Sequence, residues 1–254
     1  MDNKFGEKVK EIRKKAGLNQ DEFAKELGYT SRSTINKIEK GVRNIKVPDP
    51  DFTYPKAGFY NMKNIKSTIT RKNIIVGDYS YYSGKDFESR VTHHYEFLGD
   101  KLIIGKFCQI GNNVEFIMNG ANHQMNAATT FPFYVMDGWK QEAPTIDDLP
   151  FKGDTVVGND CWIGQNVTIL PGVHIGNRVI IGANSVVTKD LPSYSICCGN
   201  PCVIKKMRFS DEIIKILEEL KWWDKSIEEI QKIIPIITKA NPSKEELLYL
   251  IKQI

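Results

Sequence analysis

The side chain best placed for chemistry in this sequence is a histidine inside an interruption of a regular repeat. His123 ends the segment Asn119-Gly120-Ala121-Asn122-His123. A neutral imidazole can accept a proton near neutral pH, so His123 could serve as a general base toward a weak nucleophile such as an alcohol. A loop histidine on its own is more often a solvated polar residue. The interpretation of His123 therefore depends on the elements around it.

Those elements repeat with a period of six residues. An aliphatic side chain recurs at Val157, Ile163, Ile169, Ile175, Ile181 and Val187, and the same spacing joins Ile104, Ile110 and Phe116 upstream. A period of six fits neither an α-helix nor an alternating strand, so it predicts short strands and tight turns stacked as a parallel β-helix. We assign this solenoid to residues 58–205, with an inserted loop over residues 120–153.

Composition limits the class of protein. The chain has 254 residues and is 41% hydrophobic, enough for a substantial core. No apolar run approaches the roughly 18 residues of a membrane span, so we expect no membrane partner and a cytoplasmic location. The five cysteines are odd in number and lack C-x-x-C spacing. This pattern argues against a disulfide framework or a zinc site, and we expect no metal.

Residues 1–47 have the pattern of a small, basic, all-α domain. They hold twelve Lys or Arg against seven Asp or Glu, which suggests an anionic partner, although a solvated surface explains such a bias almost as often. Residues 18–24 and 33–41 resemble the Xre/Cro-repressor family. The resemblance implies a helix-turn-helix, and in such a motif one helix presents its outer side chains to DNA. These side chains would be Arg32, Ser33, Thr34, Asn36 and Lys37.

This helix-turn-helix departs from its family at the C-terminal end. Another helix follows in that family, whereas here the chain continues to Val47-Pro48-Asp49-Pro50, which proline keeps extended. We therefore expect a truncated domain and a linker over residues 48–57. DNA binding by this domain stays open beside a role as a stabilising appendage.

Residues 206–254 are predicted to be helical. Ser210, Ser226 and Ser243 each precede acidic residues at the spacing that starts a helix. Pro235 and Pro242 interrupt the pattern. We expect these amphipathic helices to pack on the end of the solenoid or on a neighbouring subunit.

Many dispersed motifs resemble the hexapeptide-repeat xenobiotic acetyltransferases. They include Lys152-Gly153-Asp154-Thr155, Gly158-Asn159-Asp160-Cys161-Trp162-Ile163-Gly164 and Gly199-Asn200-Pro201. Within that family the sequence is most similar to the streptogramin A (virginiamycin) acetyltransferases, through Asn119-Gly120-Ala121-Asn122-His123, Gly77-Asp78-Tyr79-Ser80-Tyr81-Tyr82 and Trp222-Trp223. The resemblance implies a mainly β fold, a left-handed parallel β-helix with an inserted active-site loop and C-terminal helices. It also implies a homotrimer with its sites between subunits.

The same resemblance implies roles for individual residues. His123 would be the base in acetyl transfer from acetyl-CoA to a hydroxyl of a small-molecule antibiotic. Contacts to the CoA donor would come from Trp162, Ala183, Lys189, Lys206 and Arg208. The acceptor pocket would draw on Tyr79, Tyr81, Tyr95, Leu149 and Phe151. His93 and His94 are expected on the pocket wall or at the surface, and His174 has no evident role.

Two other functions stay open. The acceptor could be chloramphenicol, a sugar or another hydroxyl compound, and competition between such acceptors would separate them. Alternatively, the chain is a DNA-binding regulator that uses its β-helix as a sensor or trimerisation platform. That hypothesis predicts salt-sensitive affinity for duplex DNA without consumption of a thioester.

Overall fold

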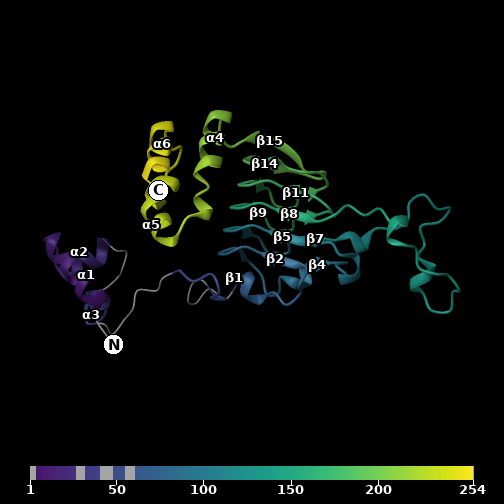
Figure 1. The fold of residues 1–254 in the computed structure, drawn as a ribbon, viewed down its shortest axis with the longest axis horizontal. Coiled ribbons are helices and arrows are strands. Elements are labelled where there is room, and N and C mark those ends of the chain that lie inside the picture. Colours follow the sequence, from purple (N-terminus) through teal and green to yellow (C-terminus); the bar gives the residue numbers. More distant parts are fainter. Residues whose placement is uncertain (1–3, 27–31, 41–47, 55–60, 254) are drawn as a thin grey trace. The chain divides into compact units, whose positions relative to one another are not determined.

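A small helical unit precedes a larger β-rich unit along the chain (Figure 1). The computed structural model describes residues 4–26, 32–40, 48–54 and 61–253. The two units divide between Pro48 and Asp49. In the described part of the chain no helix is long and apolar enough to cross a membrane.

The first unit contains α1 (Lys4–Lys15), α2 (Gln20–Glu26) and α3 (Arg32–Glu39). Their apolar sides form one small core of Val9, Phe23, Ala24, Ile35 and Ile38. Asn19 begins α2 as a reciprocal cap, because its side chain accepts from the Glu22 backbone N–H and the Glu22 carboxylate accepts from the Asn19 backbone N–H. The expected lack of a further helix concerns residues 41–47, which lie outside the described residues.

The second unit is built of three sheets, one on each face of a solenoid. Face A contains β1 (Lys63–Asn64), β3 (Tyr81–Tyr82), β6 (Gln109–Ile110), β9 (Trp162–Ile163), β12 (Ile180–Ile181), β14 (Ser195–Cys198) and β15 (Val203–Met207). Face B contains β2 (Ile74–Val76), β5 (Leu102–Ile104), β8 (Thr155–Val157) and β11 (His174–Ile175). Face C contains β4 (Val91–Thr92), β7 (Glu115–Ile117), β10 (Thr168–Ile169) and β13 (Val186–Val187).

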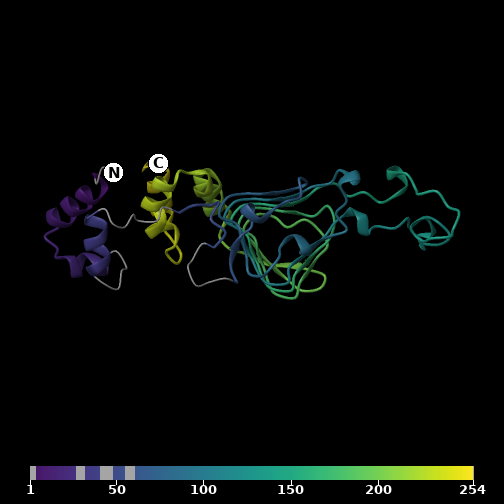
Figure 2. The ribbon, with the colours of Figure 1, turned by 90° about the horizontal axis from the view of Figure 1, so that it is seen from below.

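The six-residue period carries the chain from face to face. Val157, Ile163 and Ile169 lie on faces B, A and C in turn, and each is almost fully buried. Successive coils pair in parallel, as Ile110 with Ile163 and Ile163 with Ile181. Figure 2 shows coils from distant parts of the sequence following the same closed path. The predicted parallel β-helix is confirmed.

Glycine is required at coil corners where the backbones of adjacent coils approach each other closely. A Cβ added at Gly164 would lie 2.6 Å from the backbone nitrogen of Ala183 in the next coil. No side chain fits in that space, which explains why glycine follows the aliphatic position there.

A long arm interrupts the solenoid between β7 on face C and β8 on face B. It contains short 3-10 turns at Asn119–Ala121, Phe133–Val135 and Ile146–Asp148, and the part of it that the structure describes holds no strand. Figure 1 shows the arm extending away from the sheets. His123 lies on this arm.

Helices α4 (Asp211–Leu220), α5 (Ile227–Ile237) and α6 (Lys244–Gln253) complete the unit. Their core of Leu217, Leu220, Ile233, Leu247 and Leu250 includes Tyr194 from the last coil, so they pack on the solenoid. Ser226 forms the predicted capping box with Glu229, whereas Ser210 precedes α4 without a side-chain hydrogen bond. The last strand ends at Met207 rather than at residue 205.

Candidate active site

The ring of His123 is exposed on the arm and held by one hydrogen bond. Its Nδ1 lies 2.8 Å from the carbonyl oxygen of Thr130. Because a carbonyl oxygen can only accept, Nδ1 carries the hydrogen of the neutral ring. Nε2 therefore keeps its lone pair, which is the tautomer that a general base requires.

A small cavity of about 80 Å³ adjoins this ring. Thr130, Pro132, Tyr134 and Leu149 are among the residues that line it. Pockets for drug-sized ligands measure about 300–1,000 Å³. The cavity beside His123 is therefore smaller than such a ligand requires.

Face A carries a continuous column of outward-facing residues along the solenoid. Strand pairing joins Tyr81 to Gln109, Gln109 to Trp162, Trp162 to Ile180, Ile180 to Ile196 and Ile196 to Lys206. Trp162 is 55% exposed, although tryptophan usually buries its ring. With strands about 4.8 Å apart, Trp162 and Lys206 are roughly 14 Å apart along this column.

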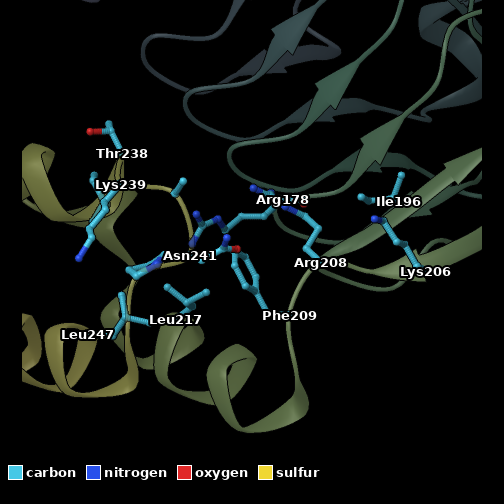
Figure 3. A pocket seen from close by; sticks show the side chains of 13 residues that line it. Arg178, Ile196, Lys206, Arg208, Phe209, Leu217, Thr238, Lys239, Asn241 and Leu247 are labelled. Atoms are coloured by element: carbon cyan, nitrogen blue, oxygen red, sulfur yellow. Dashed lines mark hydrogen bonds between the residues drawn. The ribbon is translucent and has the colours of Figure 1, made fainter.

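A larger cavity of about 370 Å³ lies where this column ends (Figure 3). The solenoid contributes Arg178, Lys206 and Arg208 to its lining, and the segment after α5 contributes Lys239. Phe209, which directly follows Arg208 in the chain, also lines the cavity. Among the described residues, neither Lys206 nor Arg208 pairs with a carboxylate within 4.0 Å. Arg178 pairs with Asp160 and Lys239 pairs with Glu246, so Lys206 and Arg208 are the cations of this cavity that are suited to bind phosphate groups.

Arg178 is the most buried cation of this cavity, with 7% of its surface exposed. Its Nε lies 3.1 Å from Asp160 Oδ2, and its backbone carbonyl accepts from Arg208 Nη1 at 2.9 Å. Burial raises the pKa of Asp160, and the charge of Arg178 opposes that rise. Burial, together with the neighbouring charge of Arg178, lowers the pKa of Arg208. A bound anion would relieve this crowding of positive charge.

The sequence pattern around Arg178 does not predict a cavity residue, because arginine at a turn is usually solvated. The sequence nevertheless contains a spacing that predicts the ion pair of Arg178. Asp160 and Arg178 occupy equivalent left-handed corners one coil apart and carry opposite charges. In a solenoid, equivalent positions of adjacent coils are neighbours, so this spacing predicts an ion pair.

The predicted donor residues are distributed over several edges of one protomer. Trp162 and Lys206 share the column on face A, and Arg208 joins Lys206 at the cationic cavity. Ala183 lies on the corner that leaves face A, whereas Lys189 follows β13 on the corner that leaves face C. One protomer therefore does not gather all five around a single groove.

The predicted acceptor residues also divide into two groups. Leu149 lines the His123 cavity, Phe151 is bonded to Leu149 through the backbone, and Tyr95 packs against Gly120 where the arm begins. Tyr81 lies on face A, and Tyr79 stands at the corner between faces B and A with its ring stacked on Phe107 at 4.9 Å. The arm leaves from the corner between faces C and B, which is opposite face A. His123 and Tyr81 are therefore on different sides of the same solenoid.

The predicted DNA-contacting residues lie on α3 of the first unit. Arg32, Ser33 and Lys37 are exposed, Asn36 is half-buried, and Ile35 and Ile38 face the core. The side chain of Thr34 lies outside the described residues. Among the described residues, no group of three or more His, Cys, Asp or Glu is placed to hold a metal.

Comparison with known proteins identifies related sequences for both units. Residues 154–189 match the family described as bacterial transferase hexapeptide (six repeats), and residues 9–49 match helix-turn-helix. The chain is 56% identical to a probable macrolide acetyltransferase of Lysinibacillus sphaericus, over 65% of this chain and 92% of the relative. It is 50% identical to virginiamycin A acetyltransferase of Staphylococcus aureus, over 76% of this chain and 90% of the relative.

More distant relatives have the same kind of name. A chloramphenicol acetyltransferase of Klebsiella aerogenes is 39% identical over 70% of this chain and 89% of its own length. A solved structure, a maltose O-acetyltransferase from Clostridium difficile 630, matches with 26% identity and a TM-score of 0.39, over 55% of this chain and 61% of that chain. The chain belongs to the hexapeptide-repeat acetyltransferases of the virginiamycin and chloramphenicol type, and it is an acyltransferase with a helix-turn-helix unit at its N-terminus.

Proposed function

We propose that this protein transfers an acetyl group from acetyl-CoA to a hydroxyl of a streptogramin A-like antibiotic, with His123 as the general base. The observation that carries the proposal is the hydrogen bond from Nδ1 to Thr130, which leaves the lone pair of Nε2 free on an exposed ring. Nε2 removes the hydroxyl proton as the oxygen attacks the thioester carbonyl. When the tetrahedral intermediate collapses, the imidazolium returns this proton to the departing thiolate.

The column on face A supports a path for the donor. Its exposed Trp162 offers apolar area for the pantetheine arm, and the cationic cavity at its end suits the phosphates. Lys206 and Arg208 would contact those phosphates beside Arg178. The roles of Ala183 and Lys189 would require another copy of the chain.

The same geometry supports the homotrimer that the family resemblance implies. His123 and the face A column lie on opposite sides of one solenoid, so a shared site needs the arm of one protomer against face A of another. The arm also exposes large apolar side chains that a neighbour would cover: Met125, Phe131, Val135, Trp139 and Phe151. Light scattering of the purified protein would measure the oligomeric state, and a monomeric enzyme with full activity would refute the shared site.

The catalytic assignment is tested by His123→Ala. Loss of a general base should lower kcat by about 10²-fold to 10⁴-fold in an assay of free thiol released from acetyl-CoA with virginiamycin M. His174→Ala is the matched control, because His174 is an exposed histidine on face B that does not line the His123 cavity. An unchanged rate for His123→Ala would refute the assignment.

The acceptor is tested by competition. The relatives with 56% and 50% identity carry names that point to different acceptors, a macrolide and virginiamycin A. We expect the highest kcat/KM with virginiamycin M, and lower values with a macrolide, chloramphenicol and a simple sugar. A preference of more than 10-fold for any of these three would replace the streptogramin assignment.

The N-terminal unit supports a second function, binding to duplex DNA. Its match to helix-turn-helix families and the exposed polar side of α3 favour this function. Affinity for DNA should then fall steeply as the salt concentration rises, because phosphate contacts release counterions. Fluorescence anisotropy of the full chain and of its Lys37→Glu variant would measure this. Equal affinities of the two proteins would refute a role for α3.

A further inference from the structure

The two ends of the arm meet at a neck, which we define as Asn119, Asn122 and residues 150–153. Asn119 closes it with one amide group, since Nδ2 donates to the Gly153 carbonyl at 2.8 Å and Oδ1 accepts from the Lys152 N–H at 2.8 Å. The outgoing chain is thus bonded to two successive residues of the returning chain. Asn119 is 3% exposed, so water competes little for these bonds.

Asp100 orients this amide through hydrogen bonds to its carboxylate. Its Oδ2 accepts from the backbone N–H of Asn119 at 3.1 Å and from Nδ2 of Asn119 at 2.7 Å. The carboxylate is fully buried, where a charge is costly unless hydrogen bonds compensate it. Because two N–H groups of Asn119 donate to Oδ2, this oxygen acts as an acceptor, and its bond to Nδ2 determines which end of the Asn119 amide faces Gly153.

His94 fixes Asp100 in turn. Its Nε2 lies 2.9 Å from the backbone oxygen of Asp100 and 3.9 Å from Oδ1, and its side chain is completely buried. The expectation that His94 lies on a pocket wall or at the surface is therefore wrong. The physical reason is that the backbone carbonyl of Asp100 gives Nε2 of the ring a hydrogen-bond acceptor inside the protein.

A second asparagine bridges the neck next to the proposed base. Asn122 Nδ2 donates to the Pro150 carbonyl at 2.7 Å, and Asn122 directly precedes His123. The backbone N–H of Asn122 also donates to the Asn119 carbonyl at 3.1 Å, so a continuous set of hydrogen bonds leads from buried Asp100 through Asn119 to the backbone that carries His123.

We propose that Asp100 and Asn119 are positioning residues for His123, so that the buried carboxylate sets the place of the base through the neck of the arm. This inference rests on the proposed function, in which His123 is the base. Neither residue lines the cavity beside the ring. Both act through the backbone that carries His123.

Asn119→Asp tests the inference with almost no change of shape. The new carboxylate donates to neither Gly153 nor Asp100, and it meets the charge of Asp100. Since a displacement of about 1 Å can cost about 10²-fold in rate, we expect kcat to fall by about that factor while KM for acetyl-CoA stays unchanged. Asn113→Asp is the control, because Asn113 also bridges two coils, donating to Asn166 at 3.3 Å, but lies at an exposed corner.

A double-mutant cycle separates positioning from general damage. If Asn119 acts through His123, Asn119→Asp should leave the residual rate of His123→Ala unchanged within about 2-fold, although it lowers the parent rate about 10²-fold. Multiplied effects of the two substitutions would overturn the inference. An unchanged kcat for Asn119→Asp would also overturn it.

Asp100→Asn provides a second variant should the first one fail to form the native oligomer. It keeps the size of the side chain and removes its charge, and we expect kcat to fall by about 10-fold with the same non-additivity toward His123→Ala. Additive loss in this cycle would overturn the inference as well. Full activity of His123→Ala would instead refute the proposed function, so the two failures are distinguishable.

Discussion

The roles of individual residues in this protein depend on their burial and on their hydrogen-bond partners. His123 on the arm has an exposed imidazole whose Nδ1 is committed to Thr130, whereas His94 is buried and bonded to Asp100. Both are histidines near the same interruption of the repeat. Only their surroundings distinguish a candidate base from a structural group.

Lys206 lines the cationic cavity, where we expect it to contact a phosphate of acetyl-CoA. Lys206→Ala should raise KM for acetyl-CoA about 10-fold and leave kcat unchanged, because a phosphate contact made equally in ground and transition states affects binding alone. Steady-state thiol release would measure both constants. Lys205→Ala is the control, since Lys205 is the adjacent residue of β15 and does not line the cationic cavity. The same change in KM for both variants would contradict a specific phosphate contact.

At the scale of elements, buried polar side chains form hydrogen bonds between segments that apolar packing alone does not join. In the first unit, the Glu39 carboxylate accepts from Arg13 Nε at 2.6 Å and from Gln20 Nε2 at 2.8 Å. It thereby joins α3 to α1 and to the start of α2. In the second unit, Asn119 joins the two ends of the arm by the same means.

The Glu39 contacts predict how stability of the first unit depends on pH. Burial acts to raise the pKa of Glu39, but its hydrogen bonds with Arg13 and Gln20 prevail and hold the pKa below 4.5. The ionised form is therefore favoured by folding, so its stabilisation is present above about pH 4.5 and is lost as the pH falls through the lower folded pKa. We expect the melting transition of this unit to shift downward over that range in the parent and less so in Glu39→Gln, as measured by circular dichroism.

Removal of the Glu39 side chain should also destabilise the first unit at neutral pH. Glu39→Ala leaves Arg13 without its partner, and both side chains are largely buried, at 6% and 13% exposed. Breaking such a pair costs about 3 kcal/mol. The loss should appear in the transition of the first unit and not in that of the solenoid, and a shift of both would contradict their independence.

At the scale of the whole molecule, we propose that the two units carry separate functions. The relatives that share the acetyltransferase part match 65–76% of this chain and about 90% of their own length, and the first unit matches a different family. Each unit has its own apolar core. The first unit is thus separate from the solenoid unit, which contains the candidate base His123 and the column on face A.

Deletion of residues 1–48 tests this division. We expect the truncated protein to retain kcat and KM for acetyl-CoA within about 2-fold, because His123 and the face A column both lie in the second unit. Affinity for duplex DNA should be lost with the deleted unit. Light scattering before and after deletion would confirm that the oligomer persists, and a loss of turnover with an intact oligomer would contradict the separation of functions.

The sequence is sufficient to predict the repeat, the inward-facing side chains and the position of the interruption, because a six-residue period of aliphatic residues with glycine is typical of stacked coils. It also determined the reciprocal caps at Asn19 and Ser226, which depend on neighbours only three residues apart. Tertiary structure decided that His94 is buried, that Arg178 lies in a cationic cavity and that Asn119 bridges the arm. These facts depend on partners distant in the chain, whose closeness is set by how the coils stack and not by local spacing.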